Sequence, residues 1–110
     1  MRITKGVISL AEAKRLVPDY VKWIEGKAKR GGYQWESWDK IWVAFQRLKR
    51  GQAVVTCDNG VYVKAKVTSI RPANYAEADG PVVRVSNGEW TWRVDGNDYA
   101  YPLKKEKPNG

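Results

Sequence analysis

The stretch AVVTCDNGVYVKAKVTSI, residues 53–70, decides the fold because it holds two β-rich runs joined by a turn signal. Asn59-Gly60 between such runs is the strongest short-range hairpin signal, since both residues accept the positive φ angles of a tight turn. From Gln52 onward the hydrophobic period changes from helical to two, which is the period of a strand. We therefore expect an antiparallel hairpin of strands 53–57 and 61–70.

Two more turn signals extend the sheet toward the C-terminus. Asn87-Gly88 joins the runs 82–85 and 89–94, and Asp95-Gly96 joins the second run to 97–103. Residues 71–81 contain Pro, Ala, Asn, Asp and Gly and are expected to form a loop.

Two-residue loops at both turns would fix the register of a three-stranded meander. The resulting pairs are Val85 with Trp90, Val83 with Trp92, Trp92 with Tyr99, Trp90 with Tyr101, and Arg93 with Asp98. One face then gathers the apolar and aromatic members of these pairs, while Arg84, Thr91 and Arg93 lie on the other. We expect the apolar face to be core. The alternative is a stacking platform for single-stranded nucleic acid.

The residues before this sheet have a helical pattern. The capping-box sequence from Ser9 to Glu12 starts a short helix over 10–16. Pro18 is a good first-turn residue, so a second helix is expected to begin there and to end before Gly31.

A third helix is expected over residues 38–50, with Ser37 as its N-cap and Gly51 as its stop. Apolar residues recur in it at the spacing of one helical face. They are Trp38, Ile41, Trp42, Phe45 and Leu48.

This order of helices followed by strands predicts an α+β fold, in which N-terminal helices pack on a C-terminal antiparallel sheet of about five strands. The 110 residues suit a single domain, 1–110. We divide it into a basic helical part at 1–50, a β part at 51–103 and a charged, frayed tail at 104–110.

The β part also resembles a known class of small binding modules. The run from Gly51 to Ile70, with its glycine, apolar strand, Asp-x-Gly turn, aromatic, alanine, valine and isoleucine, is similar to the opening of Tudor- and KOW-type SH3-like barrels. Residues 95–103 are similar to their closing strands. The resemblance covers 51–103 and implies a small SH3-like barrel that binds nucleic acid or protein.

The composition argues against most side-chain catalysis. The chain has no histidine and a single cysteine, Cys57, which excludes Ser-His-Asp and Cys-His catalysis, an internal disulfide and the usual zinc sites. We expect a non-enzymatic protein with no catalytic residue, metal, cofactor or small-molecule substrate. No apolar run has the length of a signal peptide or a membrane span, so we expect a cytoplasmic protein with no membrane partner.

The positive charge is concentrated in the N-terminal half. The net charge is +8, and residues 1–50 hold twelve Lys/Arg against five Asp/Glu. Two basic clusters end the second and third helices, and two lysines alternate on the strand that follows Gly60. The members are Lys27, Lys29, Arg30, Arg47, Lys49, Arg50, Lys64 and Lys66.

If these clusters converge, they form a surface that binds the phosphates of DNA or RNA without strong sequence specificity. The alternative is that basic helix ends only complement the helix dipole and keep the protein soluble. A second functional hypothesis is a protein-interaction or inhibitor module that docks an acidic protein surface. Its anchors would be the barrel edge and exposed aromatic rings, for which Trp35 and Tyr62 are the candidates.

Overall fold

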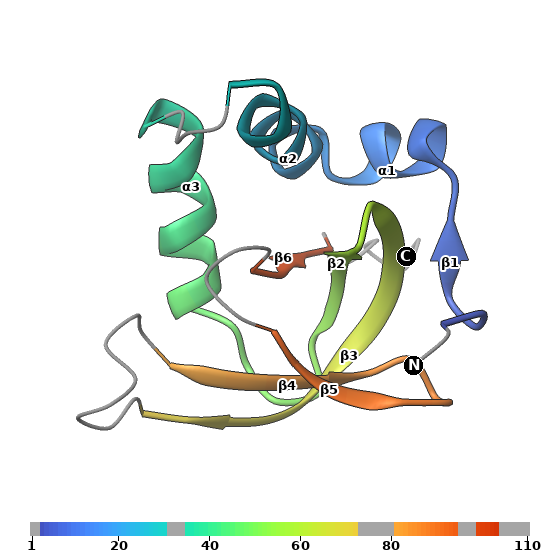
Figure 1. Cartoon of the computed structure of the whole chain (residues 1–110). Helices are drawn as coiled ribbons and strands as arrows, with labels where there is room; N and C mark the ends of the chain where they lie inside the picture. Colours follow the sequence, from blue (N-terminus) through green and yellow to red (C-terminus); the bar gives the residue numbers. More distant parts are fainter. Residues whose placement is uncertain (1–2, 31–34, 73–80, 95–98, 104–110) are drawn as a thin grey trace, which may run out of the picture.

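The computed structural model describes residues 3–30, 35–72, 81–94 and 99–103, except for the side chains at 27–30 and 35–38 (Figure 1). Most of the predicted loop at 71–81, the turn at 95–98 and the tail at 104–110 lie outside these ranges. The described part is α+β, as predicted, with the helices N-terminal and most of the sheet C-terminal. The elements are β1 (Val7–Ile8), α1 (Leu10–Leu16), α2 (Pro18–Arg30), α3 (Trp35–Gln46), β2 (Ala53–Asp58), β3 (Val61–Arg71), β4 (Val82–Ser86), β5 (Thr91–Val94) and β6 (Tyr101–Pro102).

The helix starts follow the predicted capping chemistry more closely than the helix ends do. Ser9 Oγ accepts a hydrogen bond from the Glu12 N–H at 3.1 Å, and α2 begins at Pro18. However, α3 begins three residues before the predicted start and ends at Gln46 rather than at position 50. Its last turn tightens, because the Leu48 N–H donates to the Phe45 carbonyl three residues back. No helix within the described residues is long and apolar enough to cross a membrane.

The first predicted hairpin is confirmed. β2 and β3 pair in antiparallel fashion up to Asp58 opposite Val61. The turn residues Asn59 and Gly60 have φ angles of 49° and 83°. Two positive φ angles are the signature of the tight turn that this dipeptide predicts.

The second hairpin forms with a different register. Ser86 pairs with Thr91, so the loop has four residues, and Val85 lies opposite Trp92 instead of Trp90. The cause is the Asn87 side chain, whose Oδ1 accepts the N–H groups of the two following loop residues, Glu89 and Trp90. A shift of two residues leaves each side chain on its predicted face.

The last strand does not join the predicted meander. β6 pairs with β2, with Val55 opposite Tyr101, so β5 and β6 lie at opposite edges of a sheet of order β5-β4-β3-β2-β6. The predicted pairing of Trp92 with Tyr99 is therefore wrong. The described strands form an open sheet, with β1 added beside β3 (Figure 1). The physical reason is that Tyr99 is buried, with its ring 4.8 Å from that of Phe45, so the chain crosses to the helices before β6.

The helices and β2 meet in an aromatic core. Tyr20 and Trp23 of α2 are fully buried. Tyr62 was predicted to be exposed, and this is wrong: only 6% of it is accessible. Its ring meets that of Tyr20 edge-on at 6.3 Å, because its face of β3 is turned toward α2. Burial raises the pKa of Tyr62 to about 12.

Candidate functional site

The described basic residues of the predicted patch lie on the surface. Arg47, Lys49 and Arg50 are exposed in the segment after α3, and Lys64 and Lys66 are exposed on β3. The side chains of the third cluster, Lys27, Lys29 and Arg30, and of the candidate aromatic Trp35 lie outside the described residues. The structure thus positions two of the three predicted clusters.

Backbone pairing brings these two clusters to adjoining positions. The Gly51 N–H donates to the Val67 carbonyl at 2.7 Å, and the Val67 N–H donates to the Gln52 carbonyl at 2.9 Å. The segment that carries Lys49 and Arg50 therefore enters the sheet beside Val67, the neighbour of Lys66. Figure 1 shows this segment running from α3 to the start of β2.

Strands β4 and β5 add two cations that the charge pattern of the N-terminal half did not reveal. Arg84 and Arg93 are both exposed and lie directly opposite each other. The predicted partner of Arg93 was Asp98, which lies outside the described residues. We call the solvent side of these strands the outer basic face, defined by Lys64, Lys66, Arg84 and Arg93. Strands β3, β4 and β5 contain no Asp or Glu.

The described ion pairs lie elsewhere, on the helices. They join Lys14 to Glu25, Arg15 to Glu12, and Lys40 to Asp19. None of these three pairs includes Lys64, Lys66 or Arg84. The charge of Lys64 reaches the carboxylate of Glu12: the hydrogen bond from Arg15 lowers the pKa of Glu12, and Lys64 adds a smaller effect in the same direction.

A hollow of about 400 Å³ lies next to Lys64 and Lys66, between β3 and the β4–β5 turn. Ser86, Asn87 and Gly88 line its other side. The Lys5 side chain lies over Gly88, since its Nζ is 3.3 Å from where a Cβ at Gly88 would be. The Asn87 Nδ2 donates to the Lys5 carbonyl at 2.8 Å and so anchors the N-terminal segment to this turn. A third amine therefore adjoins the two lysines of β3.

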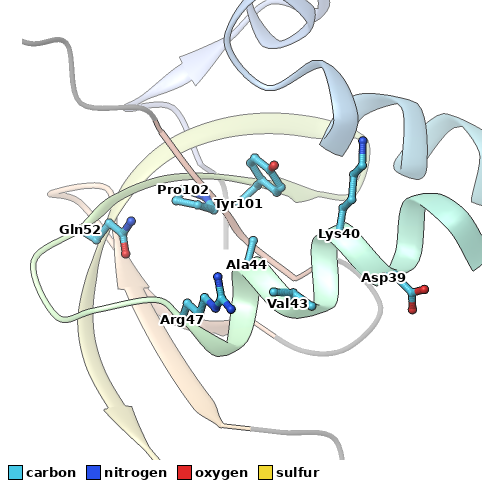
Figure 2. Close-up of a pocket in the computed structure, with 8 residues that line it drawn as sticks. All are labelled: Asp39, Lys40, Val43, Ala44, Arg47, Gln52, Tyr101 and Pro102. Atoms are coloured by element: carbon cyan, nitrogen blue, oxygen red, sulfur yellow. The ribbon is translucent and has the colours of Figure 1, made fainter.

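A second hollow, of about 550 Å³, separates α3 from β6 (Figure 2). Its floor is apolar, with Val43, Ala44 and Pro102, and Val43 is 43% exposed. Figure 2 shows Arg47 near one end and Lys40 at the other. The volume of this hollow lies in the range found for small-molecule binding sites. β6 is the end strand of the described sheet, so this groove combines that strand with apolar side chains, the cations Lys40 and Arg47, and the carboxylate of Asp39.

The described residues contain no group of three His, Cys, Asp or Glu side chains that could hold a metal ion. Cys57 is a buried thiol in β2. No protein-family model, curated protein or solved structure matches this chain.

Proposed function

We propose that this protein binds nucleic acid through a basic surface, without strong sequence specificity. The observation that carries the proposal is the outer basic face together with the α3 end: exposed cations from separate segments, on strands that hold no carboxylate. Such a surface attracts a phosphate backbone and releases the counterions condensed on it. Contacts to phosphates fix position and carry no sequence information, so little discrimination between sequences is expected.

A second part of the proposal concerns the curvature of the sheet. We propose that the sheet curls as a partly open barrel of the SH3-like type. The support is the strand order. Strands β2, β3, β4 and β5 follow one another in the sheet, and the last strand, β6, returns to pair with β2. A register irregularity between Val67 and Ser69 gives β3 a point at which to bend, because bulges increase local bending and twist.

The test is the affinity for a mixed-sequence duplex as a function of salt, measured by fluorescence anisotropy. Each phosphate contact contributes about 0.9 to the slope of log affinity against log salt, so four contacts predict roughly a hundredfold loss between 50 and 200 mM. The double substitution Lys64→Gln and Lys66→Gln should weaken binding and reduce the slope by about 2.

The matched control is Lys14→Gln, an exposed lysine paired with Glu25 on the helical side. It should change the affinity much less. A wild-type protein that shows no binding at micromolar concentration in low salt would contradict the proposal.

The groove between α3 and β6 favours a second candidate, a module that docks an acidic segment of a partner protein. Its apolar floor and Arg47 would supply contact area and charge. Pull-down from nuclease-treated extract separates the two candidates. A partner that survives nuclease and is lost on Val43→Asp substitution would favour the groove; loss of all partners with nuclease would favour nucleic acid.

A further inference from the structure

The hollow of about 400 Å³ beside β3 has positive charge on one wall and neutral groups on the others. Lys64 and Lys66 line it, and both side chains are exposed. The other described residues of its lining are Ala53, Ala65, Leu103, Ser86, Asn87 and Gly88. None of these described lining residues is an Asp or a Glu, so a ligand that enters the hollow meets two amines and no carboxylate.

The strand sets the spacing of the two amines. Lys64 and Lys66 are two residues apart on β3, so their side chains leave the same face at points about 6.6 Å apart. The backbone at Lys66 is paired on both sides, with Ala53 of β2 and with Ser86 of β4. The two attachment points are therefore fixed before a ligand arrives, which lowers the ordering cost of binding.

At one end of the hollow, a hydroxyl lies beside Lys66. Ser86 is directly opposite Lys66 in the β3–β4 register, where Cβ atoms are about 4.5–5.5 Å apart. The Ser86 Oγ accepts the Gly88 N–H at 3.1 Å, and this bond leaves the O–H as a donor. An ammonium and a hydroxyl at this position can bind the oxygens of one phosphate group.

At the other end, the N-terminal segment brings a further amine toward Lys64. The Lys64 N–H donates to the carbonyl of Gly6 at 2.8 Å, and the Asn87 Nδ2 donates to the carbonyl of Lys5 at 2.8 Å. The Lys5 Nζ lies beside Gly88, which lines the hollow. Residues from three separate segments thus meet at this end.

Two carboxylates lie near these residues but do not line the hollow. Glu12 of α1 is reached by the charge of Lys64, and its oxygen accepts a hydrogen bond from Arg15 at 3.2 Å. Glu89 follows Gly88 in the turn and accepts a hydrogen bond from the Thr4 hydroxyl at 3.0 Å. Both carboxylates reduce the positive potential around the hollow, and the hollow itself still presents amines only.

We propose that this hollow holds one nucleotide unit of a nucleic-acid strand, with Lys64 and Lys66 each on one of two successive phosphates. Successive phosphates repeat along a strand at a spacing similar to that of alternate residues in an extended chain, so the nucleic-acid backbone can run along β3. Lys5 adjoins the phosphate at Lys64, and the Ser86 hydroxyl adjoins the phosphate at Lys66. The sugar between them contacts the short apolar side chain of Ala53. This inference rests on the proposed function and gives it a defined site and a direction along the sheet.

The test uses two small probes of similar charge. A thymidine dinucleotide with a 5′-phosphate carries two phosphates separated by a sugar, whereas thymidine diphosphate carries two phosphates that are joined directly. We expect both probes to shift the backbone amide signals of Lys64, Lys66 and residues 86–88 in NMR titrations. The dinucleotide should bind at least about fivefold more tightly, because its second contact forms within the complex.

Single substitutions assign the preference to the two lysines. Lys64→Gln and Lys66→Gln should each reduce the affinity for the dinucleotide to about that for thymidine diphosphate, since each removes one of the two contacts. Lys5→Gln should weaken binding of the dinucleotide by about two- to threefold, because Lys5 only adjoins the site. Lys22→Gln is the matched control: it removes the same charge from an exposed position of α2, outside the lining, and should leave the preference unchanged.

The results distinguish the site from the function on which it rests. A wild type that binds neither the mixed-sequence duplex nor the dinucleotide overturns both. A wild type that binds the duplex, but has equal affinity for the two probes or shows amide shifts away from the hollow, overturns the site and leaves the function standing. Lys66→Gln indistinguishable from Lys22→Gln also overturns the site. Dinucleotide binding at the hollow without duplex binding supports the site and contradicts the duplex binding by which the proposed function is tested.

Discussion

At the scale of single residues, the Tyr20 hydroxyl connects α2 to two parts of the β region. It accepts the Cys57 N–H at 2.9 Å and donates to the Tyr99 carbonyl at 3.4 Å, and all three residues are buried. The Thr56 hydroxyl donates to the same carbonyl at 2.7 Å. These bonds hold Tyr99 in a left-handed conformation, with φ of 48°. A residue of α2 thereby fixes the point where the chain turns into β6.

Removal of this hydroxyl should therefore be costly. Tyr20→Phe keeps the ring contacts but deprives the buried Cys57 N–H of its partner, which costs about 1–3 kcal/mol of unfolding free energy. Urea unfolding followed by tryptophan fluorescence measures the loss. Tyr62→Phe is the control, because Tyr62 is also buried but its hydroxyl makes no hydrogen bond to another described residue. Equal losses for the two variants would contradict the assigned role of Tyr20.

At the scale of elements, β1 depends on a glycine. β1 pairs with β3 through Val7 opposite Val63, beside the end of β4. Gly6 leads into it with φ of 82°, and its carbonyl accepts the Lys64 N–H at 2.8 Å. A Cβ at Gly6 would lie 2.5 Å from the Lys64 carbonyl oxygen, so backbone would have to move. This position requires glycine for both conformation and space.

Gly6→Ala should detach β1 from the sheet. Exchange of the Lys64 amide hydrogen, measured by NMR, should become at least about tenfold faster. Gly51→Ala is a matched control, because Gly51 has nearly the same φ, 86°, and nothing within 4 Å of the added carbon. It should show only the conformational cost of about 1–2 kcal/mol. If the two variants lose the same stability, the close approach at Gly6 has no energetic weight.

The two Asn-Gly turns show how far local sequence predicts an element. Asn59-Gly60 forms the expected two-residue turn, and the strands that it joins, β2 and β3, pair up to Asp58 opposite Val61. Asn87-Gly88 has the same residues, yet Asn87 is bonded to the carbonyl of Lys5, which is 82 positions away in sequence. The sequence of the hairpin alone does not predict that hydrogen bond. The early end of α3 has a similar origin, since the chain must leave the helix in time for Gly51 to pair with Val67.

At the scale of the whole molecule, the sequence predicted the exposure of individual charged residues better than it predicted which charged residues lie next to each other. The α+β class and the exposure of Arg47, Lys64 and Lys66 follow from local patterns, and the structure confirms them. The pairing of Arg84 with Arg93 depends on the hairpin register, which the Asn87 side chain shifts through its bonds to the Glu89 and Trp90 N–H groups. The open sheet depends on the return of β6 to β2, and that return follows from the burial of an aromatic residue among the helices. The register depends on side-chain bonds within the turn and the return of β6 on long-range packing, and neither can be predicted from composition or hydrophobic period.

The net charge of +8 gives the last prediction, which concerns stability rather than binding. The radius of gyration is 13.6 Å, and the Debye length is about 30 Å at 0.01 M salt and about 8 Å at 0.15 M. At low salt every cation therefore repels every other across the molecule, while the described ion pairs are exposed and stabilise little. Added sodium chloride should raise the melting temperature by a few degrees, measured by circular dichroism, over the same range in which duplex affinity falls. Arg93→Glu, with less net charge, should show a smaller rise. A melting temperature that falls with salt would mean that attraction between charges outweighs this repulsion.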